Sequence, residues 1–162
     1  MGTAREVSTH IAAPPARVWA MVADIGRMGE WSPECQRCEL LRGATQADVG
    51  TKFRGSNRRK GGWRTESTVT EAKTGEVFAF AVGRRAPDDP DTTWRYTFSP
   101  EGEGTLVTER FEIVKEPGAV GRWFTKLGTG VKWAQRPDDL EAGMRQTLGR
   151  LKQIAESMPQ PT

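Results

Sequence analysis

Residues 7–22 read VSTHIAAPPARVWAMV, and they indicate the fold class because they join a strand directly to a helix. Apolar Val7 and Ile11 share one face with polar residues between them, which predicts a half-buried strand over Val7–Ala12. Two prolines then open a helix over Pro14–Val22, at positions where a missing backbone N–H costs nothing. A second short helix is predicted over Ile25–Trp31. The chain therefore begins with one strand and two short helices.

The remainder of the chain predicts a strand meander that ends in one long helix. Apolar and polar residues alternate up to residue 113, and short glycine turns such as Gly61-Gly62 separate the alternating segments. The segment Lys115–Arg136 shows the least regular pattern and carries several glycines. A helix over Asp138–Ser157 follows, because apolar residues repeat there at helical spacing. Six or seven antiparallel strands curl readily, and one long helix can cover their concave face.

The composition fits one globular domain. The chain has 162 residues, of which 36% are hydrophobic and 28% are charged, and this size supports a single core. We predict one domain over residues 1–162, with a loose tail at 159–162. No apolar run approaches the roughly 20 residues of a membrane span, and the N-terminus shows no apolar segment of a signal peptide. We therefore expect a cytoplasmic protein without stable membrane insertion.

Cys35 and Cys38 form a C-x-x-C motif, which is typical of redox and zinc sites. They fall in a predicted strand over Cys35–Arg42, where residues three apart point to opposite faces and their Cα atoms would lie about 10 Å apart. A disulfide requires less than about 7 Å. Zinc would lack ligands, because His10 is the only histidine. We expect two free thiols in a reducing compartment, with no bound metal or other cofactor.

Basic residues gather around the hairpin turn near residue 61, and the whole chain has a net charge of +3. A patch of this kind is either a binding surface for nucleic acid or anionic lipid, or a solvated hairpin. We favour the solvated hairpin, because no nucleic-acid-binding motif accompanies the patch. Nucleic acid is therefore not an expected partner. The basic residues of the hairpin are Arg54, Arg58, Arg59, Lys60 and Arg64.

Several motifs, taken in their order, resemble a known family. Residues 10–19 read HIAAPPARVW, residues 30–33 read EWSP, residues 50–55 read GTKFRG, and Gly104-Thr105 opens the last strand. Together they resemble the START/Bet v 1-like (SRPBCC) superfamily, in its polyketide cyclase/dehydrase-like branch, over nearly the whole chain. The resemblance implies an α+β helix-grip fold. In that fold a curved seven-stranded antiparallel sheet surrounds a long C-terminal helix, and two short helices follow the first strand. The resemblance also implies a deep cavity for a hydrophobic small molecule, and no universal catalytic residues.

The inward rows of the strands and of the long helix predict the wall of such a cavity. The wall would be apolar and aromatic with a few polar groups, which is the usual composition of a small-molecule site. Aromatic residues favour flat ligands by offset stacking, although the same residues would also suit a filled core. The predicted ligand-binding residues are Phe53, Asn57, Trp63, Thr65, Phe80, Trp94, Tyr96, Glu109, Phe111, Met144 and Leu148.

Glu109 is the most diagnostic of these residues, because it stands between Val107 and Phe111 on an inward row. A buried carboxyl group must be paired, hydrogen-bonded or protonated. Glu109 is therefore a ligand-binding or acid/base group with a raised pKa, a structural partner of an arginine, or a solvent-exposed residue if the strand register is wrong. His10 faces away from the inward side of the first strand, so we expect it to be exposed rather than catalytic.

The sequence is compatible with three functions. The first is a binding or carrier protein for a hydrophobic, aromatic or lipid-like molecule, working as a monomer or weak homodimer. The alternative is an aromatase/cyclase-type enzyme acting on a polyketide-like substrate, which would need only an oriented chain and polar groups such as Asn57, Tyr96 and Glu109. A third function is an interaction module whose basic hairpin binds an acidic partner. No catalytic residue can be assigned from the sequence.

Overall fold

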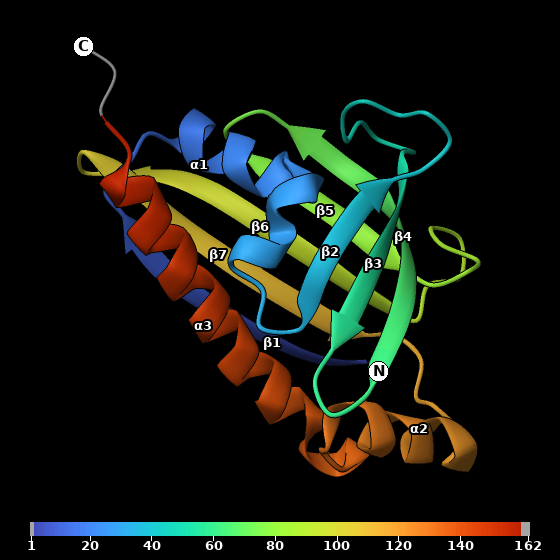
Figure 1. Cartoon of the computed structure of the whole chain (residues 1–162). Coiled ribbons are helices and arrows are strands. Elements are labelled where there is room, and N and C mark those ends of the chain that lie inside the picture. Colours follow the sequence, from blue (N-terminus) through green and yellow to red (C-terminus); the bar gives the residue numbers. More distant parts are fainter. Residues whose placement is uncertain (1, 160–162) are drawn as a thin grey trace.

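The computed structural model describes residues 2–159, and its elements follow the predicted order (Figure 1). One strand and two short helices come first, six further strands follow, and the last long helix ends the described chain. The elements are β1 (Thr3–Ile11), α1 (Pro15–Ala23), the 3-10 helix η1 (Ile25–Glu30), β2 (Cys35–Leu40), β3 (Lys52–Arg58), β4 (Gly62–Lys73), β5 (Val77–Val82), β6 (Thr92–Glu101), β7 (Gly104–Ile113), α2 (Ala119–Thr129), the 3-10 helix η2 (Trp133–Gln135) and α3 (Arg136–Ser157).

All seven strands belong to one antiparallel sheet in the order β1-β7-β6-β5-β4-β3-β2. The strands after β1 form a meander, and β1 pairs with β7 so that Thr3 lies opposite Ile113. Register shifts at Cys35/Arg37 in β2 and at Val69/Glu71 in β4 mark irregularities that bend and twist a sheet. The sheet curves around α3 (Figure 1). The predicted helix-grip fold, with its seven antiparallel strands, is confirmed.

One part of the core lies where α3 packs against β1 and β7, and the same cluster continues to α1, η1 and β5. Met144, Leu148 and Leu151 of α3 are almost fully buried, because their helical spacing places them on one apolar stripe. Val107 and Phe111 of β7 belong to the same cluster of buried side chains. Burial of each such side chain contributes about 1.5–3 kcal/mol. The long helix is therefore held by apolar packing along one side of the sheet.

The segment Lys115–Arg136 is more regular than its sequence predicts. It contains the three-turn helix α2, and α3 starts at Arg136 rather than at Asp138. Of the glycines that indicated an irregular segment, two flank α2, and Gly121 and Gly128 lie inside it. Gly118 precedes the helix, and Gly130 ends it with φ of +81°, a left-handed conformation that favours glycine at helix C-termini.

The cysteine prediction is half right. Both thiols are free, but the expectation that they point to opposite faces is wrong. Both side chains are buried, and their Sγ atoms lie 3.2 Å apart. The register shift between Cys35 and Arg37 inserts an extra residue into β2, so the simple two-residue alternation fails across the motif. Among residues 2–159, no group of three or more His, Cys, Asp or Glu side chains is placed to hold a metal ion.

Two expectations concern membranes and the C-terminus. Among the helices within residues 2–159, none combines the length and the apolar composition that a bilayer crossing requires. Residue 159 of the predicted tail is exposed, and residues 160–162 lie outside the described residues.

Candidate ligand-binding site

A cavity of about 1100 Å³ lies between α3 and the concave face of the sheet. It exists because α3 packs chiefly against β1 and β7 and leaves the inward side chains of β3 to β6 uncovered. The residues around η1 and the start of β2 close one side, and the C-terminal half of α2 lies at another edge. The fold thus provides a cavity slightly larger than the roughly 300–1,000 Å³ of usual small-molecule sites.

Most of the residues predicted for the site line this cavity. Phe111 and Leu148 do not, because their side chains fill the contact between α3 and the β1–β7 side of the sheet. Phe111 still supports the wall, since its ring lies 5.5 Å from that of Trp94. Contact of the others with a ligand stays a prediction. The predicted residues that line the cavity are Phe53, Asn57, Trp63, Thr65, Phe80, Trp94, Tyr96, Glu109 and Met144.

Tyr96 and Glu109 form a buried polar pair in the cavity wall. They are directly opposite residues of β6 and β7, and the Tyr96 hydroxyl donates a hydrogen bond of 2.6 Å to Glu109 Oε1. Glu109 is only 2% exposed, so its inward register is as predicted and the solvent alternative is excluded. The Oε2 atom has no hydrogen-bond partner among the described residues. The carboxyl group is therefore fixed by one oxygen and unsatisfied at the other.

Burial raises the pKa of Glu109 to about 8, and the Tyr96 hydrogen bond lowers it only in part. Burial, together with the neighbouring Glu109, also raises the pKa of Tyr96 well above its ordinary value. At neutral pH the carboxyl group is consequently protonated. A neutral carboxylic acid with Oε1 occupied by Tyr96 has an O–H at Oε2 to donate. The Glu109 carboxyl group thus provides a hydrogen-bond donor in a largely apolar wall. Its partner is Tyr96 and not an arginine, which was one of the alternatives for Glu109.

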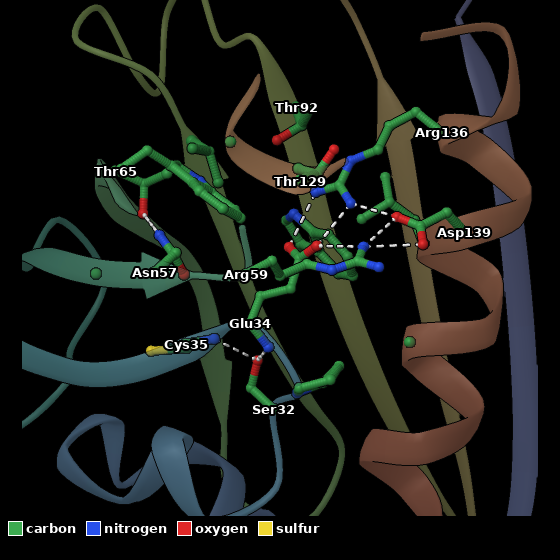
Figure 2. Close-up of a pocket in the computed structure, with 18 of the residues that line it drawn as sticks. Ser32, Glu34, Cys35, Asn57, Arg59, Thr65, Thr92, Thr129, Arg136 and Asp139 are labelled. Carbon is green, nitrogen blue, oxygen red and sulfur yellow. Dashed lines mark hydrogen bonds and ion pairs between the residues drawn. The ribbon is translucent and has the colours of Figure 1, made fainter. Parts of the chain in front are cut away.

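An ion-pair network of Glu34, Arg59, Arg136 and Asp139 lies at the edge of the cavity (Figure 2). The Arg136 guanidinium donates two hydrogen bonds to Glu34, of 2.6 and 2.9 Å, and a third to Asp139. Arg59 contacts Asp139 at 2.7 Å and Glu34 at 3.4 Å. This rim network joins the start of β2, the β3–β4 turn and the first turn of α3. It fixes the position of α3 relative to the far side of the sheet.

The network balances two positive and two negative charges in a partly buried place. The Arg136 side chain is only 10% exposed; burial by itself would lower its pKa, but the contacts with Glu34 and Asp139 raise it. Burial would likewise raise the pKa of Asp139, and the hydrogen bonds from Arg59 and Arg136 hold it below the usual range. The contacts therefore favour the charged forms of Arg136 and Asp139, as mutual pairing requires. Arg59, predicted as part of a solvated hairpin, is instead a structural partner of α3.

Sequence reasoning missed part of the wall. Met28, Cys35 and Cys38 place three sulfur atoms beside the cavity, with Cys38 Sγ 3.6 Å from Met28 Sδ. The bulge in β2 that turns both thiols inward leaves no signal in the residue pattern. Asn57 and Thr65 were predicted only as separate wall residues, and the structure pairs them: the Asn57 side-chain amide donates to Thr65 Oγ1 over 3.3 Å (Figure 2).

His10 lies outside the site, as predicted. Its side chain is exposed, and its Nε2 atom lies 3.1 Å from the carbonyl oxygen of Glu101. The cavity wall within residues 2–159 therefore contains no histidine. Glu109 and Tyr96 are one buried titratable pair of the wall, and the thiols of Cys35 and Cys38 are another.

The family model described as "Polyketide cyclase / dehydrase and lipid transport" matches residues 3–156. The chain belongs to this family. The match spans every strand and nearly all of α3, so it includes the whole cavity. No curated protein is similar enough to count as a match.

Solved structures with similar folds belong to proteins of several kinds. A Polyketide_cyc-like protein from Corynebacterium glutamicum is 29% identical over 96% of this chain and 93% of its own, with a TM-score of 0.62. The di-domain ARO/CYC protein StfQ from the steffimycin biosynthetic pathway is 16% identical, with a TM-score of 0.72, and the match covers 96% of this chain but 51% of StfQ. The Bet v 1-like protein Ara h 8.0201 is 9% identical over 98% and 100% of the two chains, with a TM-score of 0.70. At these last two identities, the similarity concerns the fold alone.

The rim network predicts a strong effect of Arg136→Met on stability. The substitution leaves Glu34 without its two-pronged partner in a partly buried place. We expect a loss of about 2–3 kcal/mol, somewhat below the roughly 3–5 kcal/mol for a fully buried pair because Arg59 remains. Urea unfolding measures the loss. Arg145→Met serves as the control, since Arg145 is 64% exposed in its i,i+4 pair with Glu141 and should cost less than about 0.5 kcal/mol. Equal costs for the two variants would contradict a structural role of the network.

The raised pKa of Glu109 predicts a pH dependence of stability that Glu109→Gln removes. Between the ordinary value of 4.5 and the folded value of about 8, the folded protein keeps a proton that the unfolded chain releases. The wild type should therefore lose stability relative to the variant as pH rises from about 5 to 8, by at most about 1.4 kcal/mol per pH unit. Above that window, the difference should level off. Urea unfolding of both proteins across this range is the measurement, and parallel curves would show that Glu109 has an ordinary pKa.

Proposed function

We propose that this protein binds a hydrophobic, ring-containing small molecule that carries one hydrogen-bond acceptor, and holds it between α3 and the sheet. One observation carries the proposal: a cavity of about 1100 Å³ whose wall contains a buried carboxyl group with one unsatisfied oxygen. An unsatisfied buried oxygen costs free energy in the empty protein. A ligand that accepts a hydrogen bond from Glu109 would recover that cost.

The aromatic residues of the wall support the choice of a ring-containing ligand. Phe53 and Phe80 pack edge to face at 5.2 Å, and Trp94 and Trp63 also line the cavity while remaining partly exposed. Rings that are already held in place offer stacking surface to a flat ligand with little loss of conformational entropy. The family description, which names cyclases, dehydrases and lipid transport, agrees with a ligand of apolar character.

The compartment and assembly belong to the same proposal. We place the protein in the cytoplasm, working as a monomer or weak homodimer.

Binding of acetylnaphthalene, a flat ketone, tests the proposal through the quenching of tryptophan fluorescence. Trp94→Ala should raise the Kd about tenfold, because the loss of stacking surface costs roughly 1–2 kcal/mol. Trp123→Ala is the matched control: Trp123 lies on α2 outside the cavity wall and is 57% exposed. It should leave the Kd unchanged. Failure of the wild type to bind, or equal effects of the two variants, would contradict the proposal.

A comparison with ethylnaphthalene isolates the role of Glu109. The ketone should bind more tightly than the hydrocarbon at pH 6, where the carboxyl group is neutral and donates a hydrogen bond. That advantage should shrink above about pH 8, since a carboxylate has no proton to donate. In Glu109→Gln it should persist at both pH values, because the amide keeps an N–H donor. An advantage that does not depend on pH in the wild type would remove Glu109 from ligand recognition.

The buried pair of Tyr96 and Glu109 favours a second candidate function, an aromatase/cyclase-type activity on a polyketide-like chain. In an aldol step, the acidic carbon between two substrate carbonyls would lose its proton to water and attack a further carbonyl, whose oxygen would take the proton of Glu109. The resulting hydroxyl would leave as water together with a neighbouring hydrogen, and Glu109 would regain a proton from solvent, so the sequence needs no external oxidant. A pKa of about 8 suits a general acid at neutral pH. The ARO/CYC proteins share this fold, and their activity is not carried over by fold alone.

Incubation with a short poly-β-keto thioester separates the two functions. An enzyme should yield a dehydrated product with new aromatic absorbance, at a rate that Glu109→Gln lowers by two orders of magnitude or so. A binding protein should return the substrate with no change beyond its spontaneous reaction. The second result, together with tight binding of the ketone probe, would favour the carrier.

A further inference from the structure

The helix α2 carries an apolar stripe on its solvent side. Val120, Trp123, Phe124 and Leu127 stand at i, i+3, i+4 and i+7, and they are 69%, 57%, 59% and 58% exposed. Residues at this spacing normally face a core. Here they are the largest group of exposed apolar side chains among the described residues. The rings of Trp123 and Phe124 pack edge to face at 5.1 Å, so the stripe is a continuous surface.

The surroundings of the stripe are basic. The helix contains Arg122 and Lys126 and no acidic residue. Trp123, Lys126 and Lys132 line one shallow groove, and the Lys60 side chain lies against the C-terminal end of α2. Within residues 2–159, neither Lys60, Lys126 nor Lys132 forms an ion pair, whereas Arg122 has one. Unpaired lysines beside exposed aromatic residues indicate a partner that is apolar and negatively charged.

We propose that α2 is a docking surface for an anionic lipid bilayer, lying flat on the membrane. Amphipathic helices of this type bury aromatic and aliphatic side chains at the level of the headgroups, and their lysines contact lipid phosphates. A second copy of the chain fits less well. Two copies meeting through this stripe would bring Lys126 and Lys132 near their own equivalents, whereas anionic headgroups neutralise them. Docking by a short surface helix requires no helix that spans the bilayer.

The position of α2 gives docking a consequence for the cavity. Phe124 and Leu127 belong both to the stripe and to the cavity edge. The amide of Gly61 in the β3–β4 turn donates a 2.8 Å hydrogen bond to the carbonyl of Gly128, so α2 is tied to the same turn as the rim network. Figure 1 shows α2 beside the N-terminal end of α3, away from α1. A membrane bound to α2 therefore lies against this edge of the cavity.

Co-sedimentation with vesicles tests the proposal. The wild-type protein should bind vesicles of phosphatidylcholine with one third phosphatidylglycerol at least tenfold more tightly than vesicles of phosphatidylcholine alone, and about 0.5 M NaCl should release much of it. The double variant Val120→Ser/Trp123→Ser should lose binding at least tenfold. Lys126→Glu/Lys132→Glu should abolish the preference for anionic lipid. Neither change alters a residue that lines the cavity.

Val49→Ser/Val114→Ser is the matched control, because these valines are 64% and 46% exposed but lie outside α2. This variant should bind vesicles as the wild type does. The proposal is overturned if the wild type ignores anionic vesicles, or if the control loses as much binding as the α2 variant. It is also overturned in favour of self-association if sedimentation shows a dimer that Val120→Ser/Trp123→Ser dissociates while vesicle binding is unchanged.

This inference is independent of the ligand proposal, and the two can fail separately. Val120→Ser/Trp123→Ser should bind acetylnaphthalene with the wild-type Kd while losing vesicle binding. Trp94→Ala should bind acetylnaphthalene more weakly while binding vesicles as the wild type does. If one variant impaired both, docking and ligand binding would not be separate properties of α2 and of the cavity.

Discussion

The packing of α3 against one side of the curved sheet determines where the core ends and where the cavity begins. Leu148 and Leu151 fill the space over β1 and β7 and hold the helix there. The sheet bends away from that contact, so α3 leaves the inward residues of β3 to β6 uncovered. The short helix α1 packs on part of β5 and β6, where Trp19 meets Phe78 edge to face, and a cavity of about 1100 Å³ remains beside it. The concave face of the sheet thus has two parts. The part that α3 covers is packed core, and the part that α3 leaves uncovered contains the cavity.

Two sets of polar residues shape the cavity: the rim network and the Tyr96–Glu109 pair. The rim network of Glu34, Arg59, Arg136 and Asp139 fixes the N-terminal end of α3, where apolar packing gives way to open space. Deeper in the wall, Tyr96 holds one oxygen of Glu109 and leaves the other unsatisfied. A carboxyl group with both oxygens hydrogen-bonded inside the protein would have only a structural role. With only one oxygen hydrogen-bonded, the buried carboxyl group is favoured in its neutral, protonated form. In that form it can donate a hydrogen bond to a polar group on an otherwise apolar molecule.

Much of this could be predicted from the sequence, for identifiable reasons. Alternation along β7 places Glu109 inward, and helical spacing places Leu148 in the core, because each depends on local periodicity alone. Strict alternation puts the thiols of Cys35 and Cys38 on opposite faces, which is wrong because a bulge leaves no mark in the residue pattern. The pairing of Arg136 with Glu34 joins segments 102 residues apart, and charge alone could not predict it. Tyr96 and Glu109 lie on neighbouring strands, but the sequence does not choose between a tyrosine and an arginine as the partner of the carboxyl group. The apolar spacing of α2 is present in the sequence, but Gly121 and Gly128 inside the helix and Gly118 and Gly130 beside it lower its helical propensity, and this conceals the element.

The claim that the cavity holds a ligand is tested most directly by native mass spectrometry of the protein purified from its own host. We predict a non-covalent adduct of a few hundred daltons at one per chain, released by denaturation, whose molecule is apolar with at least one hydrogen-bond acceptor. A spectrum that shows only the bare polypeptide, both as purified and after addition of excess acetylnaphthalene, would contradict the claim.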